Sequence, residues 1–205
     1  MTDRVLPLTE SDADPDPLRQ FTGWFADAAQ SGVSAPEAAA IATATPDGRP
    51  SVRMVLVKRV DEHGLVFFTN YESRKGRELA ANPRGALLFH YDALARQIRI
   101  EGPTSPIAPE ESAAYAASRA RGSQLSALAS PQSRRVEDRA VLEQRVAELA
   151  EHYAGRDLPL PATWGGVRLV PDRFEFWQGR DDRLHDRLLY TPGPDGGWQI
   201  ERLAP

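Results

Sequence analysis

The chain has 205 residues, 41% of them apolar, and is long enough to build one substantial hydrophobic core. Acidic residues outnumber lysine and arginine by 29 to 25, and the resulting net charge of −4 argues against nucleic acid as a partner. The absence of cysteine excludes disulfides, thiolate metal sites and thiol nucleophiles, so any redox chemistry would have to come from a cofactor. The acidic N-terminus has no apolar signal region, and no stretch approaches the roughly 18 apolar residues of a membrane span. We therefore expect a cytoplasmic protein with no membrane association.

Residues 1–15 are polar, proline-containing and aperiodic, which predicts a mobile N-terminal arm, and we expect residues 16–205 to form a single domain. A helix is predicted to follow the arm directly. Asp16 can cap this helix, and Pro17 suits its first turn. Apolar residues then recur at helical spacing and form one stripe, made of Leu18, Phe21, Trp24, Phe25 and Ala28.

The rest of the chain contains many short apolar runs separated by turn sequences such as Asp47-Gly48. These runs predict strands at residues 39–45, 51–60, 65–69, 86–91, 97–102, 167–170, 174–178, 184–190 and 198–203. Helices are predicted at residues 109–121 and 135–153, the second with a buried side made of Val141, Leu142, Val146, Leu149 and Ala150. Many short antiparallel strands with a few inserted helices favour a closed or nearly closed β-barrel decorated by helices over a parallel doubly wound sheet.

The segment from Arg183 to Arg187 carries the clearest chemical signal. On a strand, alternation would place Arg183, His185 and Arg187 on one face, with the outer two guanidinium groups starting about 13 Å apart. Such a face could bracket a phosphorylated aromatic ligand, with an imidazole at its centre. The alternative is an exposed edge strand of solvated charges. An aromatic strand at residues 174–179 lies just upstream and favours the ligand site.

A second candidate anion site lies at the start of the helix predicted after Ser73. If Ser73 caps this helix, free backbone N–H groups and the side chains of Arg74 and Lys75 converge on one spot that suits a phosphate. An ordinary surface helix start is the competing interpretation.

Arg53 and Lys58 flank four consecutive apolar residues, a pattern that predicts a strand buried on both faces with a cation near each end. The two cations are five residues apart, so a regular strand would point them to opposite faces. They could serve one ligand only if the strand twists or bulges, or if the ligand lies along it. Two cations that merely reach solvent from the strand ends are the alternative.

Tyr115, Arg119 and Ser123 have the spacing of one helix face and form a further candidate phosphate site, although Gly122 could end the helix first. Side chains of this kind also occur on helix surfaces for solubility alone. Gln97, Gln132 and Ser133 are neutral and could form hydrogen bonds with a heterocyclic ligand. Alternatively, they are ordinary polar residues of turns and strands.

Other common chemistries have little support. The four histidines show no metal-binding spacing, so no metal is expected. No serine nucleophile elbow, no GxGxxG dinucleotide fingerprint and no GxxxxGK[ST] phosphate loop is present. Hydrolysis is therefore poorly supported.

Taken together, the segments resemble the pyridoxamine 5′-phosphate oxidase family over nearly all of residues 16–205. The resemblance rests on ordered blocks along the chain, namely RMVLVK (53–58), FFTN (67–70), SRKG (73–76), RQIRIEG (96–102), SRARGSQ (118–124), PQS (131–133), WGG (164–166), EFWQG (175–179), RLHDR (183–187) and the terminal RLAP. It implies an FMN-binding split β-barrel, mainly antiparallel, that works as a homodimer. Two FMN molecules would lie at the subunit interface, and residues 164–205 would form a C-terminal dimerisation and substrate segment.

The resemblance also implies roles for individual residues at the cofactor. Arg53, Arg74 and Lys75 would hold the FMN phosphate and ribityl end, with Gln132 and Ser133 contributed by the partner subunit. The flavin pocket would be completed by Met54, Val55, Leu56, Val57, Lys58, Phe68, Thr69, Gln97, Trp177 and Arg187.

For the substrate, the family pattern implies that Lys58, Tyr115, Arg119 and Ser123 clasp a phosphate. Arg183, Leu184 and His185 would lie over the pyridine ring, with Arg183 the first choice for a catalytic residue and His185 the second. The implied reaction oxidises pyridoxamine or pyridoxine 5′-phosphate to pyridoxal 5′-phosphate by transfer of a hydride from C4′ to flavin N5, after which O2 is reduced to H2O2.

Two departures from the family pattern stand out. Phe68 replaces a tyrosine, and residues 1–15 lack the tyrosine that closes over substrate in the family. Two alternatives remain at this point. One is a related flavin oxidase of the phenazine type. Lys58, Tyr115, Arg119 and Ser123 argue against it, because a substrate without a phosphate would not need them. The other is a non-catalytic carrier of FMN or pyridoxal phosphate.

Overall fold

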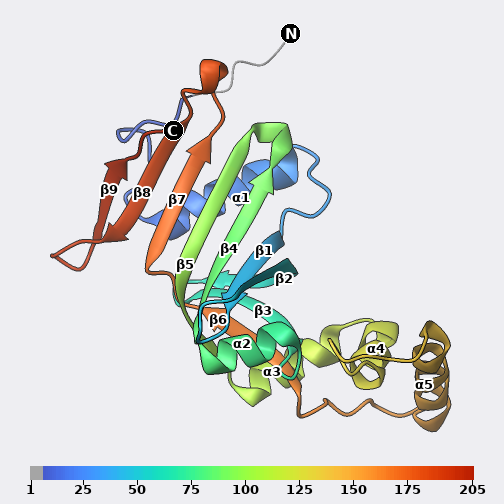
Figure 1. Cartoon of the computed structure of the whole chain (residues 1–205). Helices are drawn as coiled ribbons and strands as arrows, with labels where there is room; N and C mark the ends of the chain where they lie inside the picture. Colours follow the sequence, from blue (N-terminus) through green and yellow to red (C-terminus); the bar gives the residue numbers. More distant parts are fainter. Residues whose placement is uncertain (1–6) are drawn as a thin grey trace.

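The computed structural model describes residues 7–205, which form nine strands and five α-helices (Figure 1). The strands are β1 (Ala38–Ala44), β2 (Pro50–Asp61), β3 (Gly64–Asn70), β4 (Arg84–Tyr91), β5 (Arg96–Pro106), β6 (Trp164–Leu169), β7 (Arg173–Gln178), β8 (Asp186–Pro192) and β9 (Trp198–Arg202). The helices are α1 (Pro17–Gln30), α2 (Arg74–Ala81), α3 (Pro109–Ser118), α4 (Arg121–Ala129) and α5 (Arg139–His152). Two short 3-10 turns are η1 (Asp92–Leu94) and η2 (Asp181–Arg183).

The strands form a closed barrel with an extension, and every pairing is antiparallel. The order is β4-β1-β2-β3-β6-β5-β7-β8-β9, and an additional pairing of β4 with β5 closes the first six strands into a ring. The long strand β5 makes closure possible because its first half pairs with β4 and β7 while its last residues pair with β6. The predicted fold class, an antiparallel β-barrel decorated by helices, is confirmed.

Helix α1 covers the barrel and the adjoining sheet through the stripe predicted from its sequence. Asp16 caps the helix by accepting the N–H of Leu18 at 2.9 Å. Phe21 packs edge-on against Phe89 with a centroid separation of 5.0 Å, and Trp24 packs against Phe176 in the same way at 5.3 Å. These contacts tie α1 to β4 and β7 and fix the core.

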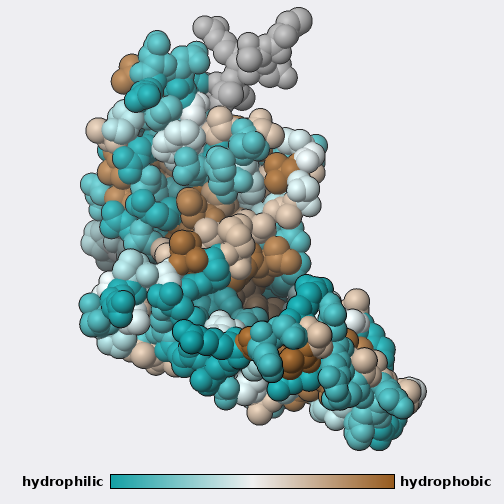
Figure 2. Space-filling model, turned by 45° about the vertical axis from the view of Figure 1, so that its right-hand side comes forward, coloured by the Kyte–Doolittle hydropathy of each residue, from teal (hydrophilic) through white to brown (hydrophobic). Residues whose placement is uncertain are grey.

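Strand β2 corrects the prediction of a strand buried on both faces. Val55 and Val57 point into the core, but the alternating residues Val52, Met54 and Leu56 are 66%, 62% and 45% exposed. Met54 and Leu88 of β4 both pair with Ala40 of β1, so they lie in one row across three strands. We refer to Val52, Met54, Leu56 and Leu88 as the apolar strip. Figure 2 shows apolar side chains gathered in the middle of the face it presents.

The prediction of a single helix over residues 109–121 is wrong, because the chain breaks at Arg119. Helix α3 ends at Ser118, Arg119 is extended with φ −76° and ψ 152°, and α4 begins at Arg121. Ser123 therefore lies on a different helix from Tyr115, and the three polar side chains do not share one helix face. Helix α4 has a weakly amphipathic sequence interrupted by glycine and serine, which explains why it was not predicted.

Helix α5 stands away from the barrel beside α4 (Figure 1). Asp138 caps α5 by accepting the N–H of Val141 at 3.1 Å. The side predicted to be buried is only half-buried in this chain, because α4 alone covers it; it comprises Val141, Leu142, Val146, Leu149 and Ala150.

Residues 7–15, part of the predicted mobile arm, lie against β8 and β9, whereas residues 1–6 fall outside the described residues. Leu8 is 7% exposed, and its N–H donates to Asp186 at 3.1 Å. Arg202 of β9 pairs with Glu10 at 2.7 Å and with Asp186 at 2.9 Å. This part of the arm is thus anchored next to the segment that carries His185 and Arg187.

Candidate active site

The first group of site residues gathers at the N-terminus of α2. Ser73 caps the helix as predicted, accepting the N–H of Gly76 at 3.2 Å. The Nζ of Lys75 donates to the hydroxyl of Thr69 at 2.8 Å and to Oε1 of Gln132 at 2.9 Å. Three predicted cofactor ligands from β3, α2 and the α4–α5 connection are thereby brought together.

Arg53 and Arg74 join this group through a buried carboxylate that the sequence analysis missed. Glu78 is 5% exposed and accepts hydrogen bonds from the hydroxyls of Thr43 and Ser51 at 2.5 Å and from Nε of Arg74 at 2.9 Å. Arg53 in turn donates to Thr43 at 2.6 Å and lies 3.4 Å from Glu78. The spacing of Arg74 and Glu78 by four residues on a helix is the signal that could have indicated this pair.

The electrostatics of this cluster are those of an anion site. Burial, together with repulsion from Arg53, lowers the pKa of Lys75 to about 8. Burial alone would raise the pKa of Glu78, but hydrogen bonds from Ser51, Thr43 and Arg74 outweigh it and bring that pKa down to about 2. Two cations, Arg53 and Arg74, contact the ionised Glu78, and an added anion would relieve the repulsion between Arg53 and Lys75. We call Arg53, Arg74, Lys75 and Glu78 the cation cluster.

A second group lies on the extension of the sheet. Gln97 of β5 pairs with Trp177 of β7, which pairs with Arg187 of β8, so the three side chains lie in one row. They line a shallow cavity of about 180 Å³ together with Leu88, Arg99, Glu175 and Pro205. Arg187 is held by Glu175 at 2.9 Å and by the carbonyl of Ala204 at 2.8 Å. We call Gln97, Trp177 and Arg187 the aromatic wall.

The structure corrects the prediction that Arg183, His185 and Arg187 alternate along one strand. Strand β8 begins only at Asp186, and the preceding turn η2 places Asp182 and Arg183 in the left-handed region, with φ of 55° and 60°. Leu184 is 72% exposed. The left-handed residues turn the chain out of the sheet, which a two-residue alternation does not reveal.

His185 nevertheless reaches the aromatic wall. Its ring lies 4.6 Å from that of Trp177, between centroids, at an angle of 43°. Its Nδ1 accepts the backbone N–H of Arg180 at 3.1 Å. A nitrogen that accepts a hydrogen bond carries no proton, so the neutral imidazole holds its proton on Nε2. His185 can therefore donate a hydrogen bond to a ligand through Nε2.

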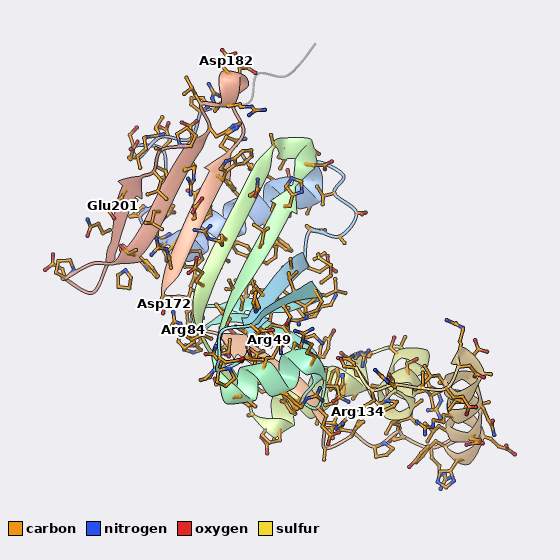
Figure 3. The ribbon with its side chains drawn as sticks, in the orientation of Figure 1. Arg49, Arg84, Arg134, Asp172, Asp182 and Glu201 are labelled. Atoms are coloured by element: carbon orange, nitrogen blue, oxygen red, sulfur yellow. The ribbon has the colours of Figure 1, made fainter. Side chains whose placement is uncertain are left out.

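The cation cluster and the aromatic wall lie on different elements of one chain, the first on β2 and α2 and the second on β5, β7 and β8. Helix α2 and the end of β3 lie below the barrel in Figure 1, whereas β5 begins and β7 ends beside η1 and η2 at the top. In Figure 3, Asp182 on η2 projects at the top of the molecule, and Arg134, which follows Gln132 and Ser133, lies near α4. Gln132 bonds Lys75 of its own chain, whereas the resemblance implied that it comes from the partner. The aromatic wall, in contrast, makes no hydrogen bond or ion pair with the cation cluster within the described residues.

The predicted substrate-phosphate ligands are only partly brought together. Tyr115 stacks on Phe68 with a centroid distance of 3.7 Å, and the guanidinium of Arg119 lies 4.9 Å above the ring of Trp164. Lys58 instead pairs with Glu37 at 3.1 Å, and Ser123 is exposed on α4. In the part of the chain that the structure describes, neither Arg119 nor Arg183 forms an ion pair with a carboxylate, which leaves both available to an anionic ligand.

Comparison with known proteins identifies the family. Residues 25–153 match the family described as pyridoxamine 5′-phosphate oxidase, and residues 164–205 match the pyridoxine 5′-phosphate oxidase C-terminal dimerisation region. The chain belongs to the pyridoxamine 5′-phosphate oxidase family. The predicted resemblance is confirmed, as is the expectation of an oxidoreductase of this type.

Two relatives in this family cover nearly the whole chain. The pyridoxine/pyridoxamine 5′-phosphate oxidase of Rubrobacter xylanophilus is 56% identical over 199 residues, 97% of this chain and 91% of the relative. The pyridoxine/pyridoxamine 5′-phosphate oxidase 1 of Ralstonia nicotianae is 55% identical over 198 residues, 97% of this chain and 93% of the relative.

Among solved structures, PhzG from Burkholderia lata in complex with tetrahydrophenazine-1-carboxylic acid superposes with a TM-score of 0.91 at 34% identity, covering 98% of this chain and 99% of PhzG. A pyridoxamine 5′-phosphate oxidase-related FMN-binding protein from Nostoc punctiforme shares the fold, with a TM-score of 0.71 at 19% identity over 92% of this chain and 97% of that protein.

Within residues 7–205, no helix has both the length and the apolar character needed to cross a membrane. The same residues contain no group of three or more histidine, aspartate or glutamate side chains arranged to hold a metal ion.

Proposed function

We propose that this protein is a homodimeric, FMN-dependent oxidase that converts pyridoxamine and pyridoxine 5′-phosphate to pyridoxal 5′-phosphate and reduces O2 to H2O2. One observation carries the proposal: the chain places a phosphate-type cation cluster on β2 and α2 and an aromatic wall on β5, β7 and β8, and within the described residues no hydrogen bond or ion pair joins the two groups. The chain also ends in a region of a type named for dimerisation. Two copies would each complete the other's site.

The residues present fit FMN. The surplus positive charge of the cation cluster suits its phosphate, and Gln132, which bonds Lys75 and is followed by Ser133, would bind the adjoining polar chain. Trp177 of a second copy would supply a flat apolar surface for the ring system, with Gln97 and Arg187 as hydrogen-bonding groups at its edge. The apolar strip of β2 and β4, which is exposed in one chain, would be covered when the copies associate.

The substrate phosphate would be bound by cations that lack carboxylate partners in the described chain. Arg119 and Tyr115 both pack near the ring of Trp164, and Tyr115 also stacks on Phe68. Arg183 would come from the same loop as His185. Lys58 could join them only by leaving Glu37, so its contribution would depend on ligand binding.

A bound FMN would supply the redox chemistry, namely removal of a hydride from C4′ and reduction of O2 to H2O2. The alcohol would also lose its hydroxyl proton and give the aldehyde directly, whereas the imine formed from pyridoxamine 5′-phosphate would be hydrolysed by water with release of ammonia. The protein side chains orient the substrate and balance its charge. His185 would donate through Nε2 to the hydroxyl oxygen that the pyridine ring carries, because its Nδ1 is committed to the N–H of Arg180. Arg183 places its positive charge over the reacting end of the substrate. We expect Arg183→Ala to lower turnover far more than FMN affinity.

The proposal is tested by loading the purified protein with FMN and mixing it in air with pyridoxamine 5′-phosphate, pyridoxine 5′-phosphate or pyridoxine. Pyridoxal 5′-phosphate absorbance should appear with both phosphorylated substrates, with matching O2 consumption and H2O2 formation. Binding without turnover would indicate a carrier instead. Oxidation of a tetrahydrophenazine carboxylic acid in preference to both phosphate esters would favour a phenazine-type oxidase.

A further inference from the structure

We propose that Trp164 is a positioning residue for the substrate phosphate, acting by holding Arg119 and Tyr115 in place. This inference rests on the proposed function, because it concerns the same substrate. Trp164 itself carries no charge and is 8% exposed, so its effect would pass through the two side chains that pack against its ring.

The rings of Phe68, Tyr115 and Trp164 form one nearly parallel group. The Phe68 ring lies 5.4 Å from that of Trp164 at an angle of 14°, and the Tyr115 ring lies 6.2 Å from it at 3°. Offset parallel rings at these separations attract one another. These contacts fix the orientation of the Tyr115 ring and leave its hydroxyl group available to a ligand.

Arg119 depends on Trp164 in a different way. Its guanidinium lies over the indole face at 4.9 Å, the preferred geometry for a cation and an aromatic ring. The ring attracts the charge without using the N–H donors, which remain available for a phosphate. The backbone of Arg119 is also held, since its carbonyl accepts from Nε2 of Gln124 at 2.7 Å.

The backbone around Trp164 is built to bring α3 close to this ring group. The N–H of Gly166 donates to Ser112 of α3 at 3.1 Å, and Tyr71 donates to the carbonyl of Gly166 at 3.0 Å. A Cβ on Gly166 would lie only 2.4 Å from Ile107 and 3.0 Å from Phe68. The two glycines after Trp164 thus allow α3 to pack closely against β6, which brings Tyr115 and Arg119 to the ring of Trp164. This close packing explains the WGG sequence.

The test compares Trp164→Leu and Trp164→Phe with wild type in the FMN-loaded protein. Removal of the cation–π contact should raise KM for pyridoxine 5′-phosphate about tenfold and leave kcat within about twofold. The inhibition constant of inorganic phosphate, used as a probe, should rise by a similar factor. KM for unphosphorylated pyridoxine should stay unchanged. Trp164→Phe should recover part of the loss, because phenylalanine retains a weaker aromatic face.

Trp198→Leu is the matched control. Trp198 packs edge-on against Phe174 on the sheet extension, with a centroid distance of 5.4 Å, and should change none of these constants. A structural role of Trp164 alone would raise KM equally for the phosphorylated and unphosphorylated substrates, and this outcome would overturn the proposal. An unchanged KM in Trp164→Leu would overturn it as well.

A double-mutant cycle with Arg119→Met completes the experiment. The part of the Trp164 effect that passes through Arg119 should disappear in Arg119→Met, so Trp164→Leu should raise KM less in that background than in the wild type, whereas independent effects would multiply. The cycle can be run with Trp164→Phe should the leucine variant fail to fold. Inactivity of the wild type toward both phosphate esters would refute the proposed function. Activity in the wild type with fully additive variants would refute only the role of Trp164.

Discussion

At the residue scale, Lys75 is a cation that loses its charge within a pH range where FMN binding can be measured. Burial and Arg53 lower its pKa to about 8, so raising the pH above that value neutralises it in the protein without cofactor. A phosphate binds the protonated form, and the dissociation constant of FMN should therefore rise about tenfold per pH unit above pH 8. Fluorescence titration of apoprotein with FMN between pH 7 and 9 measures this dependence. The second pKa of the FMN phosphate is about 6, so the phosphate keeps its charge over this range.

Two controls separate Lys75 from other groups. Riboflavin lacks the phosphate, so its affinity should stay constant over the same pH range. Lys75→Arg keeps its charge at every pH used and should remove the dependence. An equal slope in Lys75→Arg and wild type would assign the titration to another group.

Glu78 carries a prediction about stability in acid. Its pKa in the folded protein is about 2, below the ordinary value of 4.5, so the unfolded chain binds more protons between these two values. The stabilisation from ionised Glu78 is complete above pH 4.5 and is lost as the pH falls toward 2, on the order of 3 kcal/mol in total. Urea unfolding at pH 6 and pH 3 should show a smaller acid loss in Glu78→Gln than in wild type. Equal losses in the two proteins would contradict the assignment.

At the element scale, the sequence predicted those structures that depend on local periodicity. The stripe of α1 with its Asp16 cap, the Ser73 cap and most of the strands follow from spacing and capping chemistry alone. The breaks at Arg119 and at η2 were missed because each depends on one or two backbone conformations, including left-handed Arg183, which no periodic pattern reveals. The contact of Lys75 with Gln132, 57 residues away, likewise required the tertiary fold.

The strand predicted at β2 is present, but only one of its two faces is buried within a single chain. Four apolar residues in a row predicted burial on both faces, yet one chain covers only one face of β2. Covering the apolar strip with a second copy would reconcile the pattern with the structure. Val52→Asp should then weaken the dimer at least about 100-fold, because burial of a valine is worth about 1.5–3 kcal/mol and the substitution occurs in both copies. Sedimentation velocity measures the change.

Val170→Asp is the control for this prediction, since Val170 is 44% exposed on the connection between β6 and β7 and lies outside the apolar strip. It should leave the association state unchanged. A Val52→Asp protein that remains dimeric at low micromolar concentration would show that the strip is not the interface.

At the scale of the whole molecule, the proposed sharing of each site between two subunits, one giving the cation cluster and the other the aromatic wall, predicts complementation between subunits. Lys75→Met should disable both sites of a dimer, and so should Trp177→Ala, because each site needs both residues. In a mixed dimer the two defects fall in the same site, and the other site is assembled entirely from intact parts. Random exchange of equal amounts places about half of the chains in mixed dimers with one working site in two. The mixture should therefore recover about a quarter of wild-type activity.

The recovery should appear over the time of subunit exchange and should be absent when the two variants are mixed and assayed at once. FMN bound per chain should rise in parallel, which gives a readout that does not depend on turnover. If each chain instead held a complete site, every chain in the mixture would still carry its own defect, and no exchange could restore activity. The same pair of variants with the Val52→Asp substitution added should also stay inactive, because recovery requires the interface between the two subunits.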